Sequence, residues 1–250
     1  MRPQPSDRKQ PASAALVIFA KAPVPGQVKT RLCPALTEDE AATLHGSFVL
    51  DTLERTKAAA ATFKLSFDRV LACAPSSTHV FFRIMEARHG VTLLDQEGDD
   101  LGARMRHTFD QVFARGYKQV CLVGTDVPSL PLTHYRDAFA GLTRHDLILG
   151  PANDGGYYLI GMTRPHPALF VHIPWSTDQV LTLTEQKAAV AGLKTALLPQ
   201  WNDIDTLEDL QGLIDDCIAD KKRPKKDRVY STRTAGTLEL LAKRLRERRA

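Results

Sequence analysis

The feature that most constrains the fold of this chain is the alternation of short apolar, β-branched segments with segments of helical periodicity. Residues 14–20 (AALVIFA) form a fully apolar run, which is typical of a strand buried on both faces of a sheet. The same reasoning predicts further strands over 69–74, 91–94, 119–124, 146–150, 157–162 and 193–198. Helices are predicted from the capping box at residues 37–40 to about 61, and over 78–89, 101–115, 131–142, 177–191, 206–219 and 236–249.

Strands and helices therefore alternate along most of the chain, with short connections and no internal repeat. This order predicts an α/β fold, a three-layer αβα sandwich with a mostly parallel central sheet. Such sheets bind ligands beyond the carboxyl ends of their strands, so we expect the chemistry to lie in the strand-to-helix loops.

The length and composition are those of an ordinary globular protein. The chain has 250 residues, 43% of them hydrophobic, which is enough for one large α/β domain over residues 14–220. Residues 1–13 are expected to be a disordered leader, and residues 221–250 a basic tail with a peripheral helix. Four scattered cysteines and the lack of a run of about 20 apolar residues favour a cytoplasmic protein without a membrane span.

The net charge of +4 is unevenly distributed. Residues 221–250 contain 12 Lys or Arg and 3 acidic residues, so the rest of the chain has 21 basic and 26 acidic residues, a balance of −5. A mildly acidic body argues against a nucleic-acid-binding core, and no nucleic-acid partner is expected. The basic cluster KKRPKK is interpreted as a solvated tail, with attraction of an anionic partner as the alternative.

A basic loop follows the first predicted strand. It contains Lys21, Gly26, Lys29 and Arg31, with two prolines that stiffen it. Glycine allows backbone amides to approach a ligand, and the cations can neutralise phosphate charge, so the loop is predicted to bind a nucleotide through its phosphates. The P-loop and dinucleotide-binding glycine patterns are absent, and an exposed basic loop is the alternative.

Asp126 stands directly after the buried strand at 119–124. A carboxylate at this place is costly to desolvate unless it is paired or binds a cation. A divalent metal ion between Asp126 and the substrate phosphates is one interpretation, and a turn or helix-capping aspartate before Pro128 is the other.

A glycine-rich segment follows the strand at 146–150. Its residues Asp154, Gly155, Gly156 and Tyr157 leave room for a ligand, and Asp154 could accept hydrogen bonds from hydroxyl groups of the sugar or the acceptor. We assign Asp154 a catalytic or sugar-binding role together with Asp126. An Asp-Gly hairpin turn is the alternative.

Two more segments supply acidic and basic side chains. Asp203 and Asp205 could complete a Mg²⁺ or Mn²⁺ site with Asp126, or they could belong to a helix cap that uses Thr206. The stretch that begins at Asp99 and Asp100 contains Gly102 and Arg104, which are predicted to face the nucleotide or the acceptor.

Histidine gives no catalytic pattern. His45, His107 and His134 lie in predicted helices, where we expect them at the helix surface or in solvent. No nucleophile is assigned.

Five segments together resemble a known family. FAKAPVPGQVKTRL, DDLGARM, GTDVPSLP, LGPANDGGYYLIG and WNDIDTLEDL are similar, in order and spacing, to a bacterial family of glycosyltransferase-like proteins with the GT-A, nucleotide-diphosphosugar transferase fold, described as arsenosugar-biosynthesis-associated. The resemblance spans about residues 14–215. It implies that Asp126 is the metal-binding acid of the fold and that Asp203 is the late metal ligand ahead of Asp205.

A second resemblance concerns the reaction. Lys21, Lys29, Arg31 and Leu32 are similar to the loop of 2-phospholactate guanylyltransferases, and the expected fold is similar to that of molybdenum-cofactor guanylyltransferase. The leading expectation is a metal-dependent transferase that moves a glycosyl group from a nucleotide-diphosphosugar to a small-molecule acceptor. A nucleotidyltransferase that uses a nucleoside triphosphate and a non-catalytic nucleotide-binding protein are the two alternatives.

Overall fold

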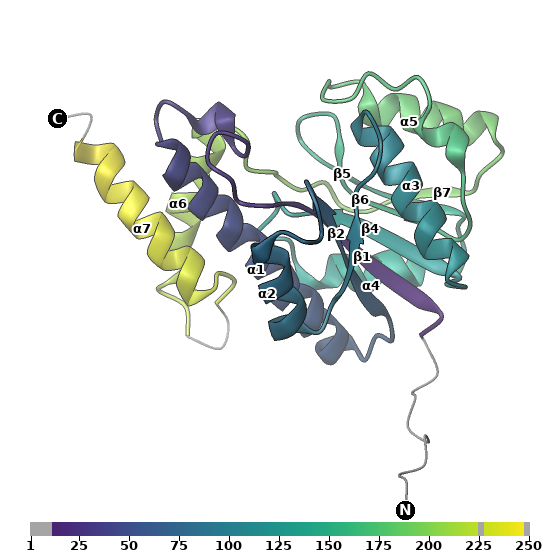
Figure 1. Ribbon diagram of the computed structural model, residues 1–250, viewed down its shortest axis with the longest axis horizontal. Helices are drawn as coiled ribbons and strands as arrows, with labels where there is room; N and C mark the ends of the chain where they lie inside the picture. Colours follow the sequence, from purple (N-terminus) through teal and green to yellow (C-terminus); the bar gives the residue numbers. More distant parts are fainter. Residues whose placement is uncertain (1–11, 225–227, 248–250) are drawn as a thin grey trace, which may run out of the picture.

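The computed structural model describes residues 12–224 and 228–247 and shows an α/β fold built on a seven-stranded sheet (Figure 1). The strands are β1 (Ala14–Lys21), β2 (Asp68–Ala74), β3 (Thr92–Asp95), β4 (Gln119–Gly124), β5 (Leu147–Pro151), β6 (Tyr157–Met162) and β7 (Thr195–Leu197). The helices are α1 (Glu38–Phe63), α2 (Val80–His89), α3 (Leu101–Ala114), α4 (Leu132–Gly141), α5 (Val180–Val190), α6 (Leu207–Asp220) and α7 (Thr232–Glu247). Two short 3₁₀ helices are η1 (Thr30–Leu32) and η2 (Pro167–Phe170).

The sheet has the strand order β3-β2-β1-β4-β6-β5-β7. The central strand β1 runs parallel to both of its neighbours, β2 and β4. Helices cover the sheet on both sides of β1, so the strand is apolar on both of its faces. Only β6 runs against the others, between β4 and β5. The prediction of a mostly parallel sheet between helical layers is confirmed.

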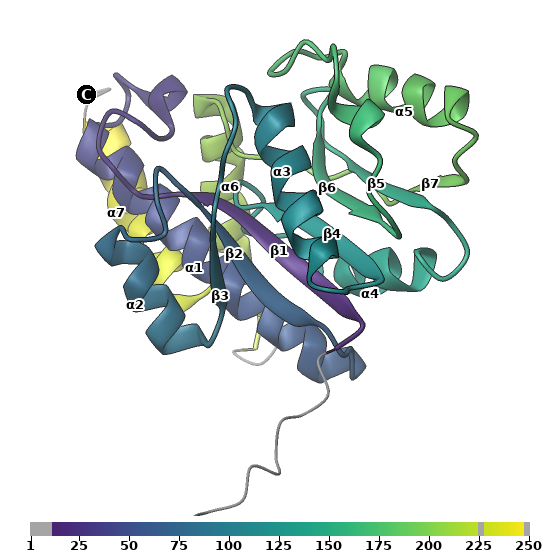
Figure 2. The same ribbon diagram turned by 45° about the vertical axis from the view of Figure 1, so that its right-hand side comes forward.

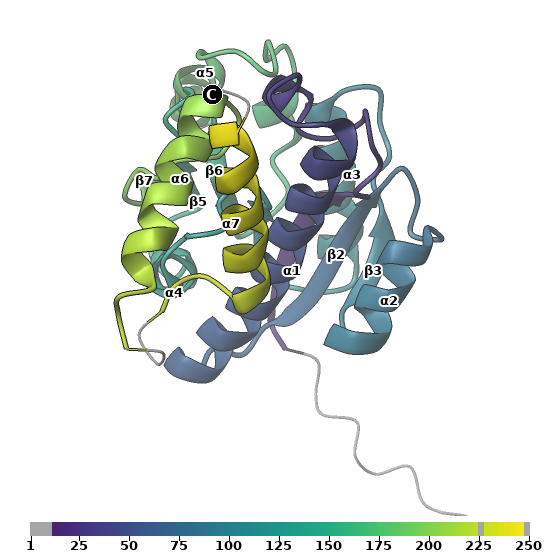
Figure 3. The same cartoon turned by 90° about the vertical axis from the view of Figure 1, so that its left-hand side faces the viewer.

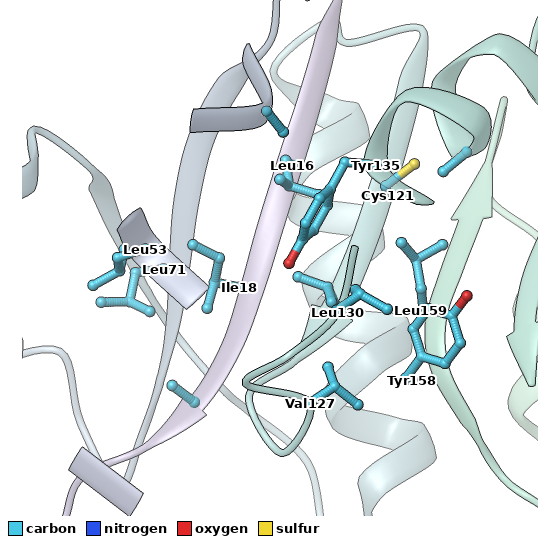
Figure 4. Close-up of a cluster of buried hydrophobic side chains, with 14 of the residues drawn as sticks. Leu16, Ile18, Leu53, Leu71, Cys121, Val127, Leu130, Tyr135, Tyr158 and Leu159 are labelled. Atoms are coloured by element: carbon cyan, nitrogen blue, oxygen red, sulfur yellow. The ribbon is translucent and has the colours of Figure 1, made fainter. Parts of the chain in front are cut away.

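Alternate residues of the strands form two separate cores. Leu16 and Ile18 point to the side covered by α1, α2 and α4, where Leu71, Tyr135 and Leu159 also pack (Figure 4). Ala15 and Val17 belong to the core on the opposite side, together with Leu169 and Phe170 of η2. Helices α3 and α5 lie over that face of the sheet (Figure 2). The period of two along β1 thus divides one apolar run between two layers.

A third core joins α1 to the C-terminal part of the chain. Helices α6 and α7 lie beside α1 on the face that points away from the sheet (Figure 3). Leu238 and Leu241 of α7 are buried there against residues of α1 and α6. The helix that was predicted over 236–249 begins earlier in the structure, at Thr232. The leader expected over residues 1–13 lies outside the described residues except for residues 12 and 13, as do residues 225–227 and 248–250 of the basic tail.

Side-chain caps explain where several helices begin. Thr37 and Glu40 form the predicted capping box of α1, and Thr206 and Asp209 form another at α6. Helix α5 begins at Val180 and not at residue 177 as predicted. The residues before it form turns, in which the Thr177 hydroxyl donates to the Pro174 carbonyl oxygen at 2.7 Å. Among the helices of the described residues, none is both long and apolar enough to cross a bilayer.

Candidate functional site

A cleft of about 630 Å³ opens at the carboxyl ends of β1 and β4. Its walls come from the basic loop after β1, the turn between β5 and β6, the N-terminal end of α3, and the segment before α6. Backbone hydrogen bonds hold the last segment in place: the Ile204 amide donates to the Asp126 carbonyl oxygen at 3.0 Å, and the Trp201 amide donates to the Pro151 carbonyl oxygen at 3.0 Å. Segments far apart in the sequence therefore meet at one edge of the sheet, as parallel topology requires.

Lys29 is buried at the floor of this cleft. Its ammonium group lies 2.6 Å from Asp126 Oδ1, 2.9 Å from Asp205 Oδ1 and 2.6 Å from the Ile204 carbonyl oxygen. Burial alone would lower the pKa of Lys29, but the two carboxylates raise it above its ordinary value, so the ammonium is charged. From the sequence, Lys29 was predicted to bind phosphate. In the structure its ammonium group contacts oxygen atoms of the protein.

Asp126 presents its two oxygens to different surroundings. Oδ1 is fully buried against Lys29, although 43% of the side chain is exposed, so the accessible part of the carboxylate faces the cleft. Burial favours the neutral acid, yet the Lys29 charge outweighs it and holds the pKa of Asp126 below the ordinary value. Asp126 is therefore an ionised carboxylate with one side open to ligands.

Three other carboxylates form a compact group. One oxygen from each of Asp154, Asp203 and Asp205 lies within 4.8 Å of the others. Asp205 also faces Lys29 and, at 3.5 Å, the guanidinium of Arg31. Among the described residues Asp203 has no cation partner, and burial together with the negative charge of Asp154 raises its pKa to about 6.

This arrangement fits a divalent cation. Carboxylate oxygens are the ligands that Mg²⁺ and Mn²⁺ accept, and the repulsion that raises the pKa of Asp203 is the repulsion that a bound cation would remove. Of the predicted ligands, Asp203 and Asp205 belong to the group, and Asp154 joins them. Asp126, also predicted as a ligand, is connected to the group through the shared ammonium of Lys29.

The turn between β5 and β6 fixes the position of Asp154. The Gly156 amide donates to Asp154 Oδ1 at 2.8 Å, and the Leu181 amide of α5 donates to the Gly155 carbonyl oxygen at 2.8 Å. Gly155 has a φ of +86°, and a Cβ there would lie 2.2 Å from the Asp178 carbonyl oxygen. Tyr157 follows at the start of β6 and lines the cleft, where burial raises the pKa of its hydroxyl. The segment thus forms an Asp-Gly turn and also lines the cleft.

Of the remaining predicted binding residues, Lys21, Arg31 and Arg104 line the cleft and Gly26 does not. Lys21 and Arg31 are exposed at its rim, and Gly26 forms the left-handed turn between them with a φ of +75°. On the α3 side, Arg104 lines the cleft and donates from Nε to the Gly98 carbonyl oxygen at 2.9 Å.

Gly102 has a different role from the one predicted. A Cβ on Gly102 would lie 2.4 Å from Nε1 of Trp175, so this glycine makes room for the indole ring. Trp175 lines the cleft, and sequence reasoning did not single it out. No pattern around Trp175 indicates that its loop folds back onto the start of α3.

His45 was expected at a helix surface, and this prediction is wrong. His45 lies on α1 and is buried; its Nε2 is 3.1 Å from the Lys21 carbonyl oxygen, and its Nδ1 is 3.9 Å from Asp126 Oδ1. Burial lowers its pKa, so the ring is neutral at neutral pH. The contact joins residues 81 positions apart, and helical periodicity gives no sign of such a contact.

Comparisons with known proteins agree with this geometry. Residues 56–177 match a family described as an uncharacterized protein conserved in bacteria (DUF2064). The chain is 32% identical to a crystal structure from Desulfovibrio desulfuricans G20, a "putative nucleotide-diphospho-sugar transferase", with 94% of this chain and 98% of that chain covered and a TM-score of 0.81. The chain belongs to this transferase family. No curated protein matches it.

More distant structures share the fold of the transferase. A cytidylyltransferase from Leptospira borgpetersenii is 14% identical, with 93% of this chain and 94% of that chain covered and a TM-score of 0.52. A CMP:2-keto-3-deoxy-manno-octonic acid synthetase, solved in complex with CTP, is 12% identical, with 81% of this chain and 98% of that chain covered and a TM-score of 0.51. At these identities the likeness concerns the fold alone.

Proposed function

We propose that the transferase moves a glycosyl group from a nucleotide-diphosphosugar to a small-molecule acceptor in the cytoplasm, with the help of Mg²⁺ or Mn²⁺. The observation that carries this proposal is the group of Asp154, Asp203 and Asp205 in a cleft whose rim carries exposed cations. The carboxylates can bind a divalent cation, and the adjacent side-chain cations can bind an anion. Together they form a site for a metal-bound diphosphate. The name of the Desulfovibrio relative, a nucleotide-diphospho-sugar transferase, supports the same donor.

Each group has a role in this mechanism. Asp154, Asp203 and Asp205 would hold the metal ion, which would supply positive charge to the departing nucleoside diphosphate. Lys21, Arg31 and Arg104 bind phosphate oxygens from the rim. The open side of Asp126 accepts hydrogen bonds from a donor or acceptor hydroxyl, because its carboxylate is ionised.

The segment between β5 and β6 orients the sugar or the acceptor. Gly156 lines the cleft beside Asp154, and Tyr157 forms the adjacent wall. Gly155 holds the turn instead, because the space at its missing side chain is filled by the Asp178 backbone. The catalytic domain in this proposal is residues 14–220. The five sequence motifs further support the arsenosugar-associated type of this family.

The test compares Asp203→Asn with the wild type. Binding of uridine, guanosine, cytidine and thymidine diphosphosugars is measured by calorimetry with and without Mn²⁺, and slow donor hydrolysis is followed by release of the nucleoside diphosphate. We expect Asp203→Asn to weaken Mn²⁺ binding by more than about tenfold, since even the loss of an outer-shell partner costs 10–100-fold in metal sites. Asp110→Asn, an exposed aspartate of α3 outside the cleft, is the matched control and should behave like the wild type.

Two results would replace the proposal. Binding of nucleoside triphosphates with release of pyrophosphate, and no response to diphosphosugars, would establish the nucleotidyltransferase that the basic loop resembles. Nucleotide binding that is unaffected by Mn²⁺ and by Asp203→Asn would instead indicate a non-catalytic nucleotide-binding protein.

A further inference from the structure

The surroundings of the Lys29 ammonium are those of a cation-binding site. Three oxygen atoms contact it, from Asp126, Asp205 and the backbone of Ile204, at 2.6–2.9 Å. An ammonium group has three protons, and each has an oxygen to bind. The Lys29 side chain is 3% exposed, so water contributes little to its solvation.

Placing the charge of Lys29 inside the protein has two costs in free energy. A buried ammonium loses its hydration, and Lys29 adopts a left-handed backbone conformation with φ 50° and ψ 35°, which non-glycine residues avoid. This conformation turns the chain at the start of η1 and directs the side chain inward. A lysine that only binds phosphate at the rim, as Lys21 can, needs neither cost.

The formal charges of the carboxylates and of the cations paired with them do not cancel. Asp126, Asp154, Asp203 and Asp205 together carry four negative charges when ionised, and Lys29 and Arg31 supply two positive charges. His45 is neutral. Summed over these residues alone, the charge is −2, which equals in magnitude the charge of one divalent cation.

We propose that Lys29 is a built-in cation that takes the place of a second metal ion, so that the cleft binds a single divalent cation. The ammonium bridges Asp126 and Asp205 as a second ion would, and it sets the positions of both carboxylates before any ligand arrives. Lys29 is thus a positioning residue. The inference rests on the proposed function, because it assumes that the carboxylate group binds a metal ion.

Truncation of Lys29 tests this directly. The change Lys29→Ala removes the charge and leaves a space lined by the three oxygens, which a second Mn²⁺ or a small alkylammonium ion can enter. The number of Mn²⁺ ions bound per chain is measured by electron paramagnetic resonance of free Mn²⁺, with and without ethylammonium chloride. Lys21→Ala is the matched control, since it removes an exposed lysine from the same loop and cleft.

We expect one Mn²⁺ per chain in the wild type and in Lys21→Ala, and two in Lys29→Ala. Ethylammonium should return Lys29→Ala to one Mn²⁺ and raise its melting temperature, whereas tetramethylammonium, which has no N–H donor, should do neither. A single Mn²⁺ in Lys29→Ala with no specific effect of ethylammonium would overturn the inference and leave the proposed function standing.

The wild type decides the question if Lys29→Ala does not fold. Two Mn²⁺ ions in the wild type would show that Lys29 does not replace one, and a single ion supports the inference. No Mn²⁺ binding in the wild type would refute the proposed function as well. Where Lys29→Ala does fold, the response of its melting temperature to ethylammonium shows, whatever the Mn²⁺ result, whether the oxygens around Lys29 form an ammonium site.

Discussion

Replacing Gly155 by alanine should destabilise the transferase far more than its backbone conformation alone explains. A φ of +86° costs an alanine about 1–2 kcal/mol. The new Cβ would also lie 2.2, 2.5 and 2.6 Å from the carbonyl oxygen, Cα and carbonyl carbon of Asp178, which are backbone atoms that cannot rotate away. Overpacking of this kind costs a further ~1–3 kcal/mol, so the expected total is about 2–5 kcal/mol.

Gly116 provides the control for this prediction. Its φ is +94°, close to that of Gly155, but a Cβ there would meet nothing within 4 Å. Gly116→Ala should therefore lose only the backbone cost of about 1–2 kcal/mol. Urea unfolding of both variants, with the melting temperature as a second measure at about 2–4 °C per kcal/mol, gives the difference. Equal losses in the two variants would refute the steric reasoning.

Two other changes test the packing of α7 and the burial of a carboxylate. Leu238 is 1% exposed, and Leu238→Ala should lower the free energy of unfolding by about 2–4 kcal/mol. Leu240 is 72% exposed, and Leu240→Ala should change it by less than about 0.5 kcal/mol. Similar losses for the two variants in urea unfolding would show that α7 is not packed as described. Asp51 is buried beside Thr234, and burial raises its pKa, so its contribution to stability is greatest below about pH 4, the ordinary value, and is lost as the pH rises through its folded-state pKa. Relative to the wild type, Asp51→Asn should therefore gain stability between pH 4 and pH 7.5, and a difference that is the same at both pH values would contradict this sign.

Much of the fold follows from local patterns. The strands over 119–124 and 157–162 were predicted with the bounds that the structure shows, because each is a short apolar run between clear breaks. The direction of β6 was not predicted. The turn before it, Ala152 to Gly156, is too short for a crossover and allows only an antiparallel neighbour, so the signal was present in the Asp-Gly pattern.

The candidate site was only partly accessible from the sequence. The acidic and basic residues after the strands were identified because strand ends of a parallel sheet gather at one edge. Their pairing was not identified, because Lys29 and Asp205 are 176 positions apart and only the folded sheet decides which cation meets which carboxylate. The same holds for His45 against Asp126. The roles of the predicted binding and metal-ligand residues stay predictions until ligands are tested.

Helix α1 lies between the sheet and the pair α6 and α7, and this position has an evolutionary consequence. One face of α1 packs into the core beneath the sheet and the other into the core that contains Leu238, while Glu40 at its start pairs with Arg244 of α7. A substitution on α1 therefore has to suit two layers at once, whereas α2, with exposed Val80 and Ile84, has to suit one. Among related transferases we expect α1 to diverge slowly, and to change together with the C-terminal helix.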